Sequence, residues 1–198
     1  MKRTMPHLDP TEKQIVFKIV YFGPGMSGKT TNLLYIHKTL TERYKGDMLV
    51  LDTEKERTLF FDFFPVSLGT VQGYSLKFHL YTIPGQIYYE ASRRIILEGA
   101  DGVVFVADSQ ADRLDDNTEM YRLMIDNLLS HGIDPSGFPV VLQYNKRDHN
   151  PRLRLGVIER ELGLEGIPVT ESIATQGRGV MRTLQLISKE IIRRFQIY

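Results

Sequence analysis

The segment from Gly23 to Thr30, which reads Gly-Pro-Gly-Met-Ser-Gly-Lys-Thr, fits the pattern G-x-x-x-x-G-K-[ST]. Such a loop binds phosphate because its backbone N–H groups converge on an anion while its lysine supplies positive charge. The β-branched and aromatic residues of 15–22 predict a strand before the loop, and residues 31–44 predict a helix after it. This is the context in which the pattern indicates a nucleotide phosphate site.

Each part of this loop has an expected role. Five consecutive residues are expected to point their backbone N–H groups at the β-phosphate: Gly25, Met26, Ser27, Gly28 and Lys29. Lys29 should bridge the β- and γ-phosphates, and the Thr30 hydroxyl should bind Mg²⁺. Thr31 either contacts the α-phosphate or is an ordinary threonine in the first helical turn.

A phosphate loop does not separate ATP from GTP, so the base must be read elsewhere. Residues 145–148, Asn-Lys-Arg-Asp, follow the apolar strand predicted over 140–144 and resemble the guanine-specificity motif N-K-x-D. The Asp148 carboxylate can accept hydrogen bonds from guanine N1–H and its 2-amino group, two donors that adenine lacks. Lys146 would lie over the base, and Asn145 would join this loop to the phosphate loop. A charged turn after a strand is the alternative interpretation.

The order of the remaining elements predicts the fold class. Residues 1–14, with Pro6 and Pro10 among charges, are expected to form a flexible extension to one domain over 15–198. Strands are expected over 48–51, 74–81, 103–107, 140–142 and 168–172, and helices over 114–131 and near the C-terminus. The strand over 74–81 alternates in polarity, as expected of antiparallel pairing. Alternating strands and helices predict an α/β fold with a mostly parallel sheet covered on both faces.

Composition excludes several classes of protein. The chain of 198 residues has 25 basic and 24 acidic residues, a net charge of +1, so no global field attracts nucleic acid. It has no cysteine and no apolar stretch long enough for a signal peptide or membrane span. Neither an N-terminal myristoylation glycine nor a prenylation cysteine is present. A cytoplasmic protein without a lipid anchor is expected; a basic cluster at Lys189, Arg193 and Arg194 fits a solvated helix face better than a lipid surface.

Two further stretches, 53–65 and 78–86, complete a family resemblance. Together with the motifs above they resemble the bacterial MglA proteins, which are Ras-like small GTPases that set cell polarity and direct gliding or twitching motility. The resemblance runs from about Phe17 to Arg194. It implies a Ras-like P-loop GTPase domain that binds GTP or GDP with Mg²⁺ and hydrolyses GTP, slowly without an activating partner.

The resemblance assigns roles to the first of these stretches. Thr58 would ligate Mg²⁺ and close over the nucleotide in the GTP state. Arg57 resembles a built-in arginine finger, which would stabilise charge that develops on the transferred phosphoryl group. A solvated loop charge is the alternative for Arg57. The aromatic run 59–64 either packs in the core or forms a strand that shifts between nucleotide states.

The second stretch and a short downstream segment complete the expected site. Gln86 would orient the attacking water, and the Gly85 N–H would sense the γ-phosphate. Thr82 stands where Ras-like proteins usually have an aspartate, a departure that MglA proteins share. In the family, the segment at Ala174 and Thr175 presents a backbone N–H, here that of Ala174, to guanine O6.

Partners and alternatives also follow from the resemblance. It implies an activating homodimer of the Roadblock fold, similar to MglB, that repositions Arg57 and Gln86, together with polarity and motility effectors that could recruit the chain to cell poles. An ATP-dependent enzyme such as a small kinase would need a lid and an acceptor site, and neither is apparent. An adaptor that binds GTP with little turnover stays open, because catalysis depends on whether these two side chains reach the γ-phosphate.

Overall fold

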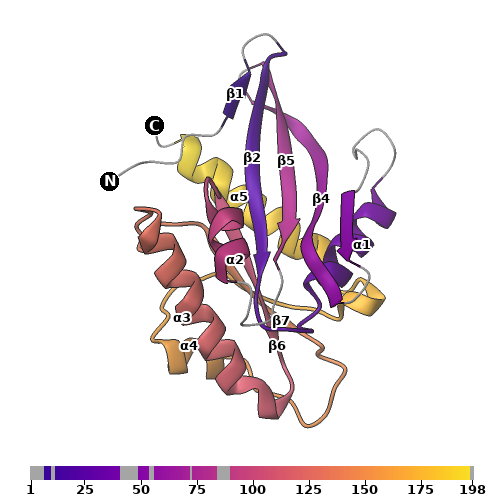
Figure 1. Ribbon diagram of the computed structural model, residues 1–198, viewed down its shortest axis with the longest axis vertical. Helices are drawn as coiled ribbons and strands as arrows, with labels where there is room; N and C mark the ends of the chain where they lie inside the picture. Colours follow the sequence, from indigo (N-terminus) through magenta and orange to yellow (C-terminus); the bar gives the residue numbers. More distant parts are fainter. Residues whose placement is uncertain are drawn as a thin grey trace.

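The computed structural model describes residues 7–9, 12–40, 49–53, 56–71, 73–83 and 90–196; at 7–9, 49–53, 56–69, 71, 90–93 and 196 it describes the backbone alone. Strands and helices alternate along the chain (Figure 1). The strands are β1 (His7–Asp9), β2 (Gln14–Phe22), β3 (Leu49–Thr53), β4 (Glu56–Val71), β5 (Tyr74–Thr82), β6 (Gly102–Asp108), β7 (Val140–Asn145) and β8 (Val169–Glu171). The helices are α1 (Lys29–Thr39), α2 (Glu90–Leu97), α3 (Leu114–Ser130), α4 (Val157–Leu162) and α5 (Val180–Gln196), with short 3-10 turns η2 (Ala111–Arg113) and η3 (Ala174–Gln176).

Within the described residues, the strands form one eight-stranded sheet. Its order is β3-β4-β5-β2-β6-β7-β8, and β1 pairs with β2 outside this path. The strands from β5 to β8 pair in parallel, whereas β3 and β4 extend the sheet by antiparallel pairing. The predicted mostly parallel sheet is confirmed. β5 is antiparallel to β4, as expected, but parallel to β2, so it joins the two parts of the sheet.

Helices cover both faces of the central strands. Every residue of β6 and β7 is buried, as their unbroken apolar runs predict. Val103 and Phe105 of β6 pack in a cluster with residues of α2, α3 and α4, while Val104 and Val106 pack in a second cluster with residues of α1 and α5. Figure 1 shows α5 passing behind the sheet and α2 and α3 on the near side. The loops at the carboxyl ends of these strands therefore start from a fully buried support.

The N-terminal segment differs from its prediction. β1 pairs antiparallel with the first residues of β2, with His7 opposite Val16 and Asp9 opposite Gln14. β6 begins its pairing with β2 only at Ile19, so β1 covers a backbone edge that would otherwise be unpaired. Part of the segment 1–14, expected to be flexible, therefore belongs to the sheet, and its other residues outside 7–9 and 12–14 are not described.

The helix after the phosphate loop starts earlier and ends earlier than predicted. α1 begins at Lys29, and Leu40 already has an extended backbone with φ −73° and ψ 143°. Leu40 still donates its N–H to Ile36 O at 3.0 Å, and its side chain packs against the cluster shared with α5. α1 therefore ends at Thr39, and residues 41–44 of the predicted helix lie outside the described residues, as do 45–48.

The stretch 53–65, to which the resemblance assigns Arg57 and Thr58, is mostly strand in its described part. β4 starts at Glu56 and runs for 16 residues, so Arg57 and Thr58 lie near the beginning of a strand. Its aromatic and β-branched content explains this, since such residues favour pleated structure. The pairing shifts register between Ser67 and Thr70 against β5, and at two places against β3.

Two helices escaped prediction. α2 and α4 are short, with eight and six residues, and short amphipathic segments give weak periodicity. α4 does carry a recognisable signal, because Gly156 and Gly163 flank it in left-handed conformations. None of the helices in the described part of the chain is long and apolar enough to cross a membrane.

Candidate functional site

The phosphate loop connects the end of β2 directly to the start of α1. Gly23 has φ +141°, and a Cβ there would lie 2.3 Å from the carbonyl oxygen of Val106 on the neighbouring strand. Gly28 has φ +98°, and a Cβ there would lie 2.2 Å from Nδ2 of Asn145. Both positions therefore need glycine for space as well as for backbone conformation. Met26, between them, also has a positive φ of 61° and is 82% exposed.

Lys29 places a positive charge inside this loop. It is the first residue of α1 and is buried, and its Nζ donates to Gly23 O at 2.9 Å and to Pro24 O at 2.6 Å. The positive end of the helix dipole lies at the same point, and the first turn of α1 contains no acidic residue. An anion such as phosphate would relieve this concentration of positive charge. Thr30 and Thr31 are half-buried in the same turn.

Asn145 joins the base loop to the phosphate loop, as the sequence predicts. It lies at the end of β7 and is only 2% exposed. Its Nδ2 donates to Ser27 O at 2.7 Å. Its Oδ1 accepts from Ser172 Oγ at 2.9 Å and from Ala174 N at 3.0 Å. One amide therefore fixes three loop segments that meet at the carboxyl edge of the sheet.

The last of these bonds bears on the predicted guanine O6 contact. The backbone N–H of Ala174 donates to Asn145, whereas the sequence assigned it to the base. Ala174 is buried at the start of η3, and Thr175 beside it is exposed. The contact with O6 stays a prediction, and it requires this N–H to be shared or redirected when a nucleotide binds.

Asp148 and Lys146, the two charged residues predicted to contact the base, differ in whether their charged groups are already paired. The Asp148 side chain is exposed and open to a ligand. Lys146 has a positive φ of 60°, and its Nζ donates to Asp108 Oδ2 at 2.7 Å. Its ammonium group thus pairs with a buried carboxylate, so only its aliphatic chain is left to lie over a base as predicted.

Arg147, between them, is a positioning residue that the sequence did not reveal. Its Nε donates to Glu171 at 2.7 Å, its Nη1 donates to Leu153 O at 2.7 Å, and its backbone N–H donates to Ser172 O at 3.1 Å. Its guanidinium lies over the Tyr144 ring, 5.9 Å from the centroid. These contacts hold the base loop against the end of β8.

A buried polar network behind the phosphate loop was also missed. Asn32 on α1 donates to Gly28 O at 2.9 Å and accepts from Gln143 Nε2 at 3.1 Å. Gln143 also donates to Thr183 Oγ1 at 2.9 Å, which contacts Thr170 Oγ1 at 2.8 Å. A glutamine inside the apolar run of β7 is the one signal that could have indicated it, since buried amides require partners.

Comparison with known proteins now places the chain. It is 45% identical over 188 residues to the mutual gliding-motility protein MglA of Myxococcus xanthus, covering 95% of this chain and 96% of that protein. It is 28% and 27% identical to ADP-ribosylation factor-like protein 6 of Caenorhabditis briggsae and of Caenorhabditis elegans, over 59% and 60% of this chain and 63% and 64% of those proteins. No family model matches the chain.

The chain belongs to the MglA family of Ras-like small GTPases. Its parallel sheet with helices on both faces is the Ras-like P-loop GTPase fold. Guanine-nucleotide binding is the general property of small GTPases, and it agrees with an exposed Asp148 beside a phosphate loop.

The residues that the MglA resemblance assigns to hydrolysis are less completely described. Arg57 and Thr58 lie on β4, where the backbone alone is described. Gly85 and Gln86 lie outside the described residues. Thr82, at the position of the usual Ras-like aspartate, is fully buried at the end of β5. The placement of the four catalytic and switch residues relative to the nucleotide is therefore still a prediction.

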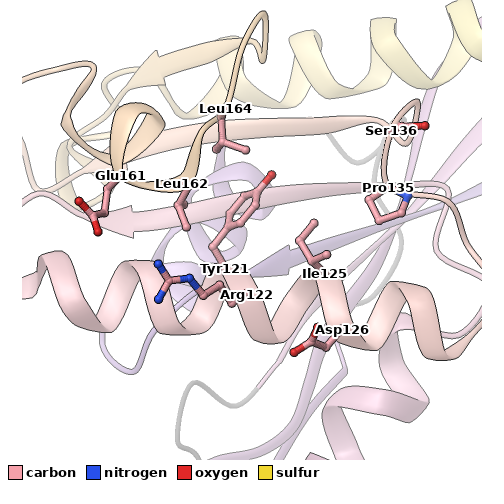
Figure 2. Close-up of a pocket in the computed structure, with 9 residues that line it drawn as sticks. All are labelled: Tyr121, Arg122, Ile125, Asp126, Pro135, Ser136, Glu161, Leu162 and Leu164. Carbon is pink, nitrogen blue, oxygen red and sulfur yellow. The ribbon is translucent and has the colours of Figure 1, made fainter.

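A cavity of about 390 Å³ lies between α3 and α4. Figure 2 shows Tyr121, Ile125, Leu162 and Leu164 converging on it, with Arg122 and Glu161 at one side. Burial raises the pKa of Tyr121 to about 12, so its hydroxyl stays neutral near pH 7. Among the described residues, none of those predicted for the nucleotide site lines this cavity.

Proposed function

We propose that the chain is a switch that binds GTP and hydrolyses it to GDP and phosphate. The observation that carries the proposal is the Asn145 contact with Ser27 O, at 2.7 Å, which joins the phosphate loop to the base loop. It puts the exposed Asp148 at a fixed distance from Lys29, as a single nucleotide spanning both loops requires.

Binding would use the two loops for different parts of the nucleotide. Lys29 would exchange its bonds with the loop carbonyls for bonds with β- and γ-phosphate oxygens, which carry full negative charge. Asp148 would accept from guanine N1–H and its 2-amino group. An adenine base would leave this carboxylate unpaired, and that cost favours guanine.

The donor set fits Mg²⁺ held jointly by the protein and the nucleotide. Thr30 offers a hydroxyl in the first turn of α1, and Thr58 is the second expected ligand. Among the described residues, no three His, Asp or Glu side chains gather into a metal site, so most of the ligands would be phosphate oxygens and water. When bound, Mg²⁺ would neutralise charge on the β- and γ-phosphate oxygens.

For hydrolysis we assign three side chains. Gln86 would orient the attacking water, Arg57 would stabilise charge in the transition state, and Lys29 would hold the phosphates in line. Gly25 leaves room beside the γ-phosphate for the first two. Turnover by the isolated chain would be slow, because Arg57 and Gln86 would need a partner to bring them into position.

The cellular role follows from the similarity to the Myxococcus xanthus protein, whose name describes mutual gliding motility. We propose that this chain controls polarity and motility through its GTP state, in the cytoplasm and at the cell poles. An MglB-like homodimer of the Roadblock fold would activate hydrolysis, and effectors would bind the GTP form.

Base specificity is tested by Asp148→Asn. The variant should lose GTP affinity by about a hundredfold and gain xanthosine triphosphate affinity, because xanthine offers an oxygen where guanine has its 2-amino donor. Competition binding with both nucleotides measures this change. Asp126→Asn, at an exposed position on α3, is the matched control and should change neither affinity. Retained GTP preference in the Asp148 variant would refute the base site.

Hydrolysis is tested by phosphate release from Mg²⁺ and GTP, with and without a Roadblock-fold homodimer. We expect slow release from the chain alone and acceleration by the partner. If GTP binds with Asp148-dependent specificity but no phosphate is released in either case, the chain is a GTP-dependent adaptor, and the enzymatic part of the proposal is wrong.

A further inference from the structure

Asp108 is a buried carboxylate at the nucleotide edge that no step above uses. It is the last residue of β6 and is 1% exposed. Asn117 of α3 holds its backbone on both sides, accepting from Asp108 N at 2.9 Å and donating to Asp108 O at 2.8 Å. The position of this carboxylate is therefore set by the sheet and by α3, independently of any ligand.

Two cations from different segments approach the same oxygen. Lys146 Nζ of the base loop lies 2.7 Å from Asp108 Oδ2, and Arg113 Nε of η2 lies 3.9 Å from it. The other oxygen, Oδ1, accepts from the backbone N–H of Gln110 at 3.1 Å. A carboxylate buried to this degree is costly unless it is paired, so Lys146 is held close to it. Arg113 lies at ion-pair distance from Asp108 and also pairs with Asp116, whose Oδ2 lies 2.5 Å from Arg113 Nη1.

Arg113 extends this arrangement to the phosphate loop. Its Nη2 donates to Gly25 O at 3.3 Å. In a trans peptide the C=O and the following N–H point in opposite directions, so drawing Gly25 O toward Arg113 turns the N–H of Met26 to the other side. The predicted phosphate site needs the Met26 N–H among the groups that converge on the anion. Asp108 therefore acts on the base loop directly and on the phosphate loop through Arg113.

We propose that Asp108 is a positioning residue that couples guanine recognition to phosphate binding. It holds the Lys146 ammonium so that the aliphatic chain lines the base site, and it orients Arg113 so that the Met26 N–H faces the β-phosphate. This inference rests on the proposed nucleotide function of the two loops. Its direct consequence is slow release of the bound nucleotide.

The effects of Asp108 on the base loop and on the phosphate loop can be separated by comparing the binding of GDP with that of GMP, which lacks the β-phosphate. Arg113→Gln should lower the affinity for GDP by about tenfold and leave the affinity for GMP unchanged, because only the contact of Arg113 with the phosphate loop is lost. Asp108→Asn, which keeps the shape but removes the charge, should weaken both nucleotides and speed GDP dissociation by about tenfold or more. In the double variant, the loss of GDP binding free energy should be smaller than the sum of the losses in the two single variants, because both substitutions act through one carboxylate.

Asp115→Asn is the matched control. It removes the same charge at an exposed position in the first turn of α3, so GDP affinity should change by no more than about twofold. Thermal unfolding of nucleotide-free protein shows whether each variant folds, and if Asp108→Asn does not fold, Arg113→Gln alone decides the outcome.

Folded variants that release GDP at the parent rate would overturn the proposal, as would equal losses of GDP and GMP in Arg113→Gln. A parent protein that binds neither nucleotide would instead refute the proposed function itself, so the two failures are distinguishable.

Discussion

The loops beyond β6 and β7 and the strand that carries Arg57 differ in the contacts that the structure describes for them. Asn145, Asp108 and Arg147 each bond to several elements through their side chains. β4 is held by antiparallel backbone pairing at the edge of the sheet, with register shifts against both neighbours. The central parallel pairs run without such shifts along β2 and β5 and along β6 and β7.

This difference indicates a division of labour. The loops proposed to bind the nucleotide are joined by side-chain hydrogen bonds that start from buried strand ends. Arg57 and Thr58, which are predicted to act in hydrolysis, lie on a strand whose alignment is less uniquely specified, since an irregular ladder near the sheet edge fixes register weakly. Substitutions in the first region should change affinity, and substitutions in the second should change turnover.

The sharpest test of this division is Arg57→Ala, with Gln86→Ala as its companion. Each should slow partner-stimulated GTP hydrolysis by about a thousandfold or more while GTP affinity stays within a few-fold of the parent, because their contacts form mainly in the transition state. Single-turnover phosphate release and GTP titration measure the two quantities. Arg182→Ala, at an exposed position on α5, is the control. Collapse of affinity with unchanged turnover per bound GTP would show that both residues belong to the binding region.

A smaller effect is expected from Gly28→Ala in the binding region. An alanine at φ +98° is strained by about 1 to 2 kcal/mol, and its Cβ would displace Asn145 from Ser27 O. GDP affinity should fall by about tenfold with the loss of this junction. Gly132→Ala is the matched control, because Gly132 has φ +73° but no atom within 4 Å of an added Cβ. If both variants keep parent affinity, the contact does not position the loops.

The smallest effect concerns the amino ends of the same central strands. Asp101 accepts from Lys18 N at 2.8 Å, and burial raises the pKa of its carboxyl to about 7 from 3.8. Between these values the folded protein binds more protons than the unfolded chain, so stability should fall as pH rises from about 4 to 7. Asp101→Asn should flatten this dependence in urea unfolding at pH 5 and pH 8, with GDP affinity unchanged. An equally steep fall in the variant would contradict the assignment.

Much of the binding region could be predicted from the sequence. The phosphate loop and residues 145–148 are local sequence patterns. The strands that precede them are predicted by apolar runs, which reflect burial alone. What escaped prediction is the set of contacts between segments far apart in the chain. Asp108 and Arg113 each look like ordinary polar residues until the fold brings them beside Lys146 and Gly25.

The edge region was harder to predict for a different reason. A solvated loop was the alternative for Arg57, but β4 pairs with β3 from Glu56 and with β5 from Phe63, and this backbone pairing outweighs the local preference of charged residues for a loop. The same competition put β1 on β2, although Pro6 and Pro10 flank it. Whether such a segment forms a strand depends on pairing partners that lie elsewhere in the sequence, and a local pattern gives no information about those partners.

The final helix also affects how the chain folds as it is made. Phe195 of α5 packs edge-on against Phe17 of β2, with ring centroids 5.6 Å apart, and Ile191 lies so close to Gly102 that a Cβ there would be 2.7 Å from its Cδ1. The part of this sheet face that α1 does not cover therefore stays exposed until α5 has been synthesised. Cores that close through contacts so distant in sequence form slowly, and their exposed strands are prone to aggregate in the interval. Truncation within α5 should thus reduce the yield of folded protein during synthesis before it alters any property of the mature site.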